Sequence, residues 1–206
     1  MISSGHSPKF AEIYFCMRLS FFAFAFLLIG TIGCQQPTKT AETKQVPVPA
    51  AAPSSRLGKE GTDQLTTLLA AYYDLKDALV ATNAGKADIA ASRILSAGET
   101  FNNNLPKDST NQVLLQHIDT IMKQSEAILG IKDESCMLKR VFFEKISTAM
   151  YAAVKDAQLQ HAGIYHQYCP MAFNEKGAYW LSNVSEIQNP YYGKKMLECG
   201  EVKDSL

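Results

Sequence analysis

The chain has 206 residues, of which 20 are basic and 20 acidic, and 47% are hydrophobic. This composition predicts a folded core, and a neutral chain without a basic block gives no electrostatic reason to expect a nucleic-acid partner. The sequence has no glycine-rich phosphate loop and no HExxH or GxSxG motif, so we expect no enzymatic activity.

Residues 17–33 have the pattern of a secretory signal. Arg18 is followed by an apolar run over residues 19–28 and then by small residues. The run is too short for an ordinary membrane span. It ends in TIGC, which resembles the bacterial lipobox, although Thr31 stands where Leu is usual. We therefore predict that Cys34 is lipidated and begins the mature protein.

The segments on either side of this signal differ in character. Residues 1–16 hold Pro8 and Glu12, which a signal does not need, so we interpret Met17 as the true start. Residues 34–58, by contrast, comprise the lipidated cysteine and a stretch rich in Pro, Ala, Thr and Ser. Such a stretch cannot bury a core and predicts an extended tether. No acidic cluster follows Cys34, which favours an outer-membrane lipoprotein facing the periplasm.

The remaining residues, 59–206, are enough for a single domain with a real core. Four windows have the period of an amphipathic helix, and short links join them, which predicts an up-down four-helix bundle. The windows are residues 62–82, 86–103, 109–129 and 134–161. The expected core stripes are Leu65, Leu68, Leu69, Tyr72, Leu75 and Leu79; Ile89, Ile94, Leu95 and Phe101; Leu114, Ile118, Ile121, Met122 and Ile128; Leu138, Val141, Phe142, Ile146, Met150 and Val154.

The tail of this domain, residues 164–202, has a different pattern. Residues 164–173 and 178–181 are aromatic and β-favouring, and the turn sequence NEKG separates them. A second turn, NPYYG, follows at residues 189–193. We expect a mainly α fold with a small two-stranded hairpin or an irregular Cys-rich cap, which must pack on the helices to be stable.

The tail also concentrates soft metal ligands. The sequence runs H-x-x-C-x-M and then M-x-x-C. Thiolate, thioether and imidazole groups suit Cu(I). In an extended strand, Cys169 and Met171 would share a face because they are two residues apart. The candidate metal ligands are Cys169, Met171, Cys199, Met196 and His166.

A structural role explains the same cysteines equally well. In an oxidising compartment, Cys169 and Cys199 could form a disulfide that fixes the last segment to the hairpin. Methionines also fill gaps in cores. Cys136 is expected to be a buried free thiol, although it could pair with either tail cysteine. The residues alone leave the metal site and the disulfide both open.

Five segments together resemble an uncharacterised bacterial envelope domain family. They are YYDLKDALVATNAGKA, YCPMAF, AYWLS, EIQNPYYGKKML and CGEV, and the resemblance covers about residues 65–202. The matching tail residues are Cys169, Pro170, Met171, Trp180, Asn189, Pro190, Gly193, Met196 and Cys199.

The resemblance carries its own expectations. Members occur as secreted or lipid-anchored single domains, and also fused to periplasmic adaptor subunits of copper- and silver-type RND heavy-metal efflux systems. The resemblance therefore implies a role near metal export, with an efflux adaptor as partner and no known catalysis. Two functions remain: a Cu(I)-type binding module, or an interaction module closed by a Cys169–Cys199 disulfide that docks on an envelope partner.

Overall fold

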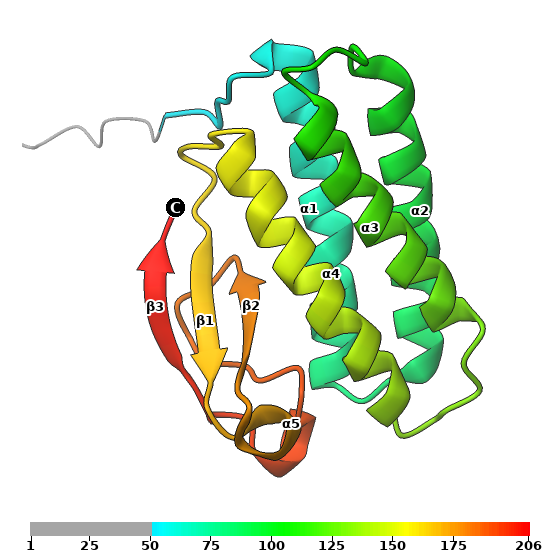
Figure 1. Ribbon diagram of the computed structural model, residues 1–206. Helices are drawn as coiled ribbons and strands as arrows, with labels where there is room; N and C mark the ends of the chain where they lie inside the picture. The colour runs from blue at the N-terminus through cyan, green and yellow to red at the C-terminus, as the bar shows by residue number, and fades with distance from the viewer. Residues whose placement is uncertain (1–50) are drawn as a thin grey trace, which may run out of the picture. The chain divides into compact units, whose positions relative to one another are not determined.

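The structure is a computed structural model that describes residues 51–206, all within one compact unit. The predicted signal, Cys34 and most of the tether lie outside the described residues. Four long helices dominate: α1 (Gly58–Val80), α2 (Ala84–Asn104), α3 (Gln112–Leu129) and α4 (Met137–Asp156). They lie side by side in Figure 1, and each packs on the next in sequence. No helix in residues 51–206 is long and apolar enough to cross a membrane.

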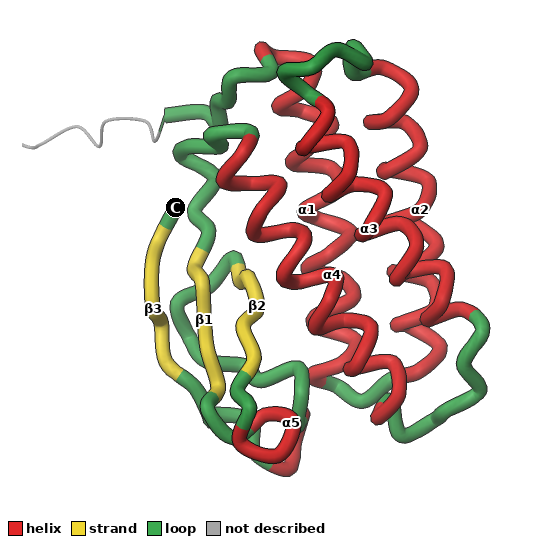
Figure 2. The backbone as a smooth tube through the Cα atoms, in the orientation of Figure 1, coloured by secondary structure: helices red, strands yellow, loops and turns green. Residues whose placement is uncertain are grey.

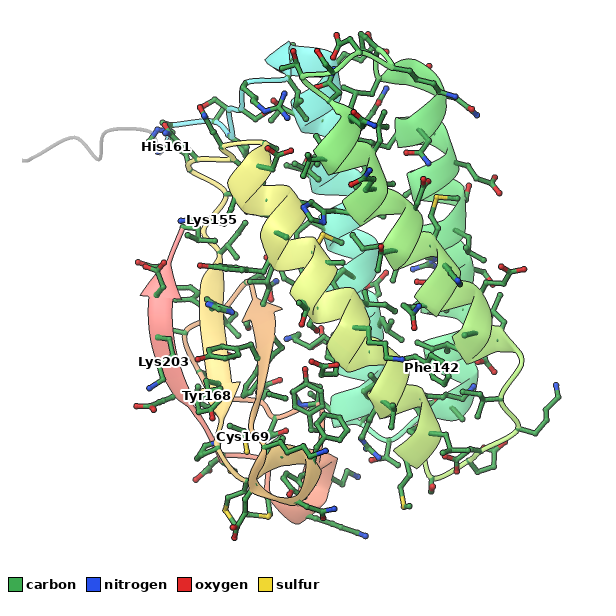
Figure 3. All side chains as sticks on the ribbon, in the orientation of Figure 1. Phe142, Lys155, His161, Tyr168, Cys169 and Lys203 are labelled. Carbon is green, nitrogen blue, oxygen red and sulfur yellow. The ribbon has the colours of Figure 1, made fainter. Side chains whose placement is uncertain are left out.

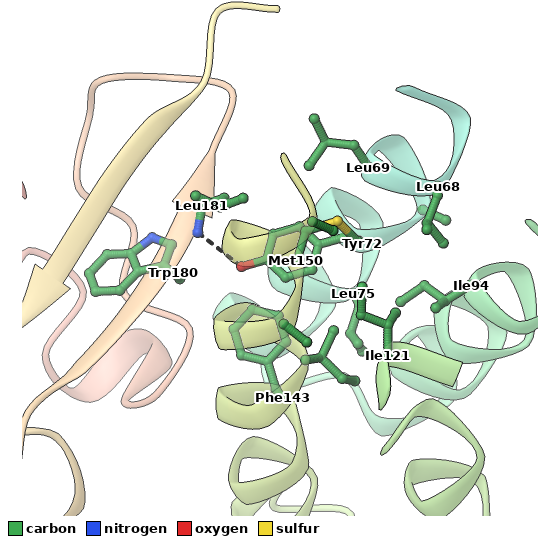
Figure 4. Close-up of a cluster of buried hydrophobic side chains, with 14 of the residues drawn as sticks. Leu68, Leu69, Tyr72, Leu75, Ile94, Ile121, Phe143, Met150, Trp180 and Leu181 are labelled. Atoms are coloured by element: carbon green, nitrogen blue, oxygen red, sulfur yellow. Dashed lines mark hydrogen bonds between the residues drawn. The ribbon is translucent and has the colours of Figure 1, made fainter. Parts of the chain in front are cut away.

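The core confirms the predicted stripe of α1 in full. Its six apolar residues are 0–3% exposed and meet Ile94, Ile121 and Phe143 from the other three helices (Figure 4). Asn83 caps α2, since its side chain accepts a hydrogen bond from the Lys86 N–H at 2.9 Å, and α3 is followed by Gly130. The compact unit thus contains its own core and should fold without the first 50 residues.

Two of the other stripes were partly wrong. Ile89 is 59% exposed, and in α4 Leu138 and Val141 are 57% and 40% exposed. Helix α4 is also shorter than the predicted window of residues 134–161: it begins at Met137 and ends at Asp156. Ile146, Met150 and Val154 are buried as predicted. The buried face of α4 also carries Lys139, Arg140, Phe143 and Ser147.

The tail forms a three-stranded antiparallel sheet rather than the predicted two-stranded hairpin. Strands β1 (Tyr165–Cys169) and β2 (Ala178–Ser182) pair as expected, and β3 (Glu201–Ser205) adds to the other edge of β1. A short turn, α5 (Ala172–Glu175), joins β1 to β2, and Phe173, Asn174 and Glu175 all have left-handed φ angles between 53° and 65°. The 3-10 turn η1 (Gly193–Lys195) lies between β2 and β3.

Strand β2 faces the helices with its outer edge, and two tyrosines satisfy that edge. The Leu181 N–H donates to the Tyr72 hydroxyl oxygen at 2.9 Å, as the dashed line in Figure 4 shows. The Tyr191 hydroxyl donates to the Tyr179 carbonyl oxygen at 2.5 Å. A strand edge buried without partners would be costly. The Tyr72 bond therefore ties β2 to α1, and the Tyr191 bond ties the segment after β2 to the same strand edge.

Candidate functional site

The most distinctive feature of the tail is the contact between its two cysteines, here called the thiol pair. The Sγ atoms of Cys169 and Cys199 lie 2.7 Å apart, although 30 residues separate them in the chain. Cys169 ends β1 and is fully buried, whereas Cys199 directly precedes the turn into β3 and is partly exposed. Figure 3 shows Cys169 at the end of the sheet nearest α5. Both alternatives that the sequence left open, a metal site and a disulfide, require the two cysteines to lie close together, and this contact does not choose between them.

Residues 183–200, the covering loop, bring Cys199 back to the sheet. Figure 2 shows that most of this connection is loop. The buried Gln167 amide donates to three successive carbonyl oxygens, those of residues 184–186, at 3.0–3.2 Å. The Asn189 amide donates to the Cys199 carbonyl oxygen at 2.7 Å. Sequence reasoning missed Gln167, whose only signal was a polar residue inside an aromatic strand.

Gly200 allows the covering loop to approach the sheet closely. Its φ is +152°, and a Cβ there would lie 2.8 Å from the Trp180 ring and 2.9 Å from the Tyr168 carbonyl oxygen. Any side chain at this position would push the loop, and Cys199 with it, away from Cys169. Steric contact with the sheet therefore explains why glycine follows Cys199 in the CGEV motif.

Arg140 of α4 anchors the middle of the covering loop. Its Nε donates to the Pro190 carbonyl oxygen at 2.7 Å, and its Nη2 donates to the Leu79 carbonyl oxygen at 3.0 Å and to Thr82 Oγ1 at 2.9 Å. Its Nη1 donates to the Ser135 carbonyl oxygen at 2.8 Å. The guanidinium joins three segments and has no carboxylate partner among residues 51–206, and burial lowers its pKa from the ordinary value.

The thiol pair has an electrostatic consequence for Cys199. Burial, together with the hydrogen bond and charge of the neighbouring Cys169, raises the pKa of Cys199 to about 11, while a backbone hydrogen bond from Met171 opposes this. The Cys199 thiol is therefore protonated at neutral pH. Any ion that it binds must displace that proton, so binding is coupled to pH.

The two candidate methionines flank the pair without the geometry predicted for Met171. Strand β1 ends at Cys169, so Met171 is not in a strand with it; its side chain is 45% exposed. Its carbonyl oxygen accepts a hydrogen bond from the Tyr192 hydroxyl at 2.5 Å. Met196 follows η1, and its carbonyl oxygen accepts from the Cys199 N–H at 3.2 Å, so the two residues lie in one turn.

His166 is placed away from the thiol pair. It lies three residues before Cys169 in β1, and an odd spacing puts the two side chains on opposite faces of a strand. Its imidazole stacks between Tyr151 and Tyr179, with ring centroids 4.0 and 4.7 Å away. Burial and the nearby Lys155 lower the pKa of His166 and Asp204 raises it, with a net lowering.

Cys136 takes no part in this site. It is fully buried just before α4, with its Sγ 3.9 Å from the Glu134 carbonyl oxygen, and burial raises its pKa. Among residues 51–206, no three His, Cys, Asp or Glu side chains are grouped to hold one metal ion. A metal at the thiol pair would thus have the two cysteine sulfurs as donors. The thioethers of Met171 and Met196 are further candidate donors close to them in sequence.

Comparison with known proteins identifies one family. A family model described as "Protein of unknown function (DUF3347)" matches residues 68–162, which run from the first half of α1 to just beyond α4 and end before β1. No curated protein and no solved structure matched the chain. Over its helices, the chain is therefore similar to a domain family of unknown function, and the thiol pair lies outside the matched range.

Proposed function

We propose that the chain is a periplasm-facing, lipid-anchored accessory module of a soft-metal efflux system, and that its reduced thiol pair binds a Cu(I)-type ion. Contact between Cys169 and Cys199 across 30 residues is the observation that carries this proposal. The lipobox at Cys34 and the tether supply the anchor on the outer membrane, and an RND-type adaptor is the proposed partner. The ion is cargo, and no enzymatic step is involved.

The chemistry of the pair suits a soft ion of low coordination number. With metal–sulfur bonds of about 2.3 Å, two thiolates on one ion lie roughly 3.8–4.6 Å apart. The pair, at 2.7 Å, would have to open by about 1–2 Å to reach this separation, and Cys199, the partly exposed member, would make that movement. Two thiolates with Met171 or Met196 would discriminate against Mg²⁺ and Ca²⁺, which need oxygen ligands.

The short sulfur–sulfur separation also favours a second candidate. A pair already in contact can oxidise without rearrangement, and a Cys169–Cys199 disulfide would close the covering loop onto β1. The chain would then be an interaction module whose fixed tail docks on an envelope or adaptor protein. This candidate needs no metal, and it makes opposite predictions for oxidised and reduced protein.

We also infer that α1–α4 form an up-down four-helix bundle, the arrangement that carries the tail in both candidates. Consecutive helices pack on each other, and the links between them are short enough to require antiparallel neighbours. The α1–α4 contact is the thinnest, and the Tyr72 hydroxyl reaches out to β2 beside it.

A competition titration against a Cu(I) chelator separates the two candidates. Reduced protein is expected to bind about one Cu(I), and the double variant Cys169→Ser with Cys199→Ser should lose that binding with its helices intact. Cys136→Ser is the matched control and should bind like the wild type. If reduced wild type binds no more tightly than the double-serine variant, the metal proposal is wrong. The disulfide candidate then predicts that oxidised wild type is more stable than this variant by about 2–4 kcal/mol.

The raised pKa of Cys199 gives the binding a pH dependence. Because its folded pKa is about 11, this thiol holds its proton throughout pH 6–9. Each bound ion must therefore release at least that proton, and apparent Cu(I) affinity should rise by a factor of about ten or more for each pH unit. The measurement repeats the titration at several pH values, corrected for protonation of the chelator. An affinity independent of pH would show that Cys199 is not a ligand.

A further inference from the structure

A groove runs along the outer surface between α1 and α2, away from the thiol pair. Two hollows make up this groove, and they share Asp74 and Arg93. Small side chains give the groove a shallow floor: Ala70, Ala71, Ala78, Ala81, Ala90 and Ala97. Ile89 lines one end and is 59% exposed, so a large apolar side chain stands beside a flat alanine surface.

The two rims of this groove carry opposite charges. Asp74 and Asp77 stand on α1, and Lys86 and Arg93 stand on α2. Arg93 Nη1 donates to Asp74 Oδ2 at 2.8 Å, which places these two residues at the same level along the helices. Both side chains remain more than half exposed, so each can accept a second partner.

We propose that this groove face is the interface of a homodimer whose two-fold axis runs parallel to α1 and α2. Such an axis exchanges the two rims and keeps the level of each residue, so α1 of one copy lies on α2 of the other. The acidic rim then meets the partner's basic rim, and Asp74 faces the partner's Arg93. A two-fold axis across the helices would instead place acidic rims together, which is unfavourable.

The same symmetry provides a place for the exposed isoleucine. Ile89 lines the same hollow as Ala78 and Ala81, so these residues share a level along the helices. The two-fold axis carries the partner's Ile89 over this alanine surface, and the reciprocal contact forms on the other side. A large apolar residue against small ones is the packing expected when helices interdigitate.

The size of the face predicts a weak dimer. The groove spans residues 64–81 of α1, about 27 Å at 1.5 Å per residue. With two helices about 10 Å wide, roughly 500 Å² of each copy is covered, or about 1,000 Å² in total. This area lies at the lower limit for specific interfaces, so the dimer should form only at high protein concentration.

Charge exchange between two variants tests the interface, using sedimentation velocity of residues 51–206 over a dilution series. Wild type is expected to dimerise reversibly. Asp74→Arg gives a basic face and Arg93→Asp an acidic one, so each alone should dimerise at least tenfold more weakly. Mixed one to one, they should form a heterodimer, and the double variant carrying both changes should dimerise with itself. Circular dichroism confirms that each variant is folded.

Two results would overturn the proposal: wild type that stays monomeric up to about 1 mM, or folded single variants whose mixture stays monomeric. Ile89→Asp tests the apolar contact and should also weaken the dimer at least tenfold. Val113→Asp is the matched control, because Val113 is 52% exposed on α3, outside the groove. Equal weakening by both changes would place the contact elsewhere and contradict the proposed face.

Discussion

Replacing Ile121 with Asp is expected to destabilise the domain by about 4 kcal/mol or more, because it removes a core side chain and buries a carboxylate without a partner. Ile121 is 0% exposed in α3 and packs in the cluster shared by all four helices. At about 2–4 °C per kcal/mol for a domain of this size, the melting temperature should fall by about 8–16 °C. Thermal unfolding followed by circular dichroism measures this.

Val113→Asp makes the same kind of change on the same helix and serves as control. Val113 is 52% exposed in the first turn of α3, where a carboxylate interacts favourably with the helix dipole. Its effect on the free energy of unfolding should stay within about 0.5 kcal/mol. If Ile121→Asp melted like this control, the assignment of the buried face of α3 would be wrong.

The helices show how far hydrophobic pattern alone can lead. All six apolar positions predicted for α1 are buried, although the helix also buries Thr62 and Lys76, which the pattern did not include. The stripe of α4 was wrong in its first turns, because two positions on the buried face there hold Lys139 and Arg140, which the pattern assigns to solvent. Lys139 is buried because its Nζ donates to Asp88 and to the carbonyl oxygens of Ile128 and Ile131. A hydropathy pattern cannot predict burial that depends on hydrogen-bond partners from distant parts of the chain.

The tail shows the same division between local and long-range information. Turn residues predicted where the chain reverses, and the two reversals do bring Cys199 to Cys169. Strand β3 was missed because all five of its residues are exposed and carry no apolar alternation. His166 was a candidate ligand with Cys169, but its ring stacks between Tyr151 and Tyr179, on the face of β1 opposite Cys169.

Replacing Arg140 with Met is the second change with a large expected effect. Met nearly matches the reach of the side chain but makes none of its hydrogen bonds, so the Pro190, Leu79 and Ser135 carbonyl oxygens lose a buried donor. The Leu79 oxygen still accepts from the Thr82 N–H at 3.1 Å. At about 1–3 kcal/mol for each of the other two groups, a loss of about 2–6 kcal/mol is expected. Arg140→Lys keeps the charge without the planar fork of donors and should recover only part of this.

The matched control is Arg93→Met, which removes an exposed ion pair and should change stability by less than about 1 kcal/mol at low protein concentration. Urea unfolding measures the free energies of all three variants. Equal effects of Arg93→Met and Arg140→Met would show that the buried guanidinium contributes nothing particular.

The Arg140 variant should also alter the thiol pair, although the guanidinium bonds to neither cysteine. Arg140 holds the Pro190 carbonyl, and the neighbouring Asn189 side chain holds the Cys199 carbonyl at 2.7 Å, so one chain of contacts runs from α4 to the thiol pair. Releasing its first link should free the covering loop, slow oxidation of the pair and weaken Cu(I) binding by the reduced protein. Hydrogen exchange over residues 183–200 should rise in the same variant. If exchange rises while oxidation and Cu(I) binding stay at wild-type levels, the helices do not position Cys199, and the hydrogen bonds of Gln167 and Asn189 are enough to hold the pair.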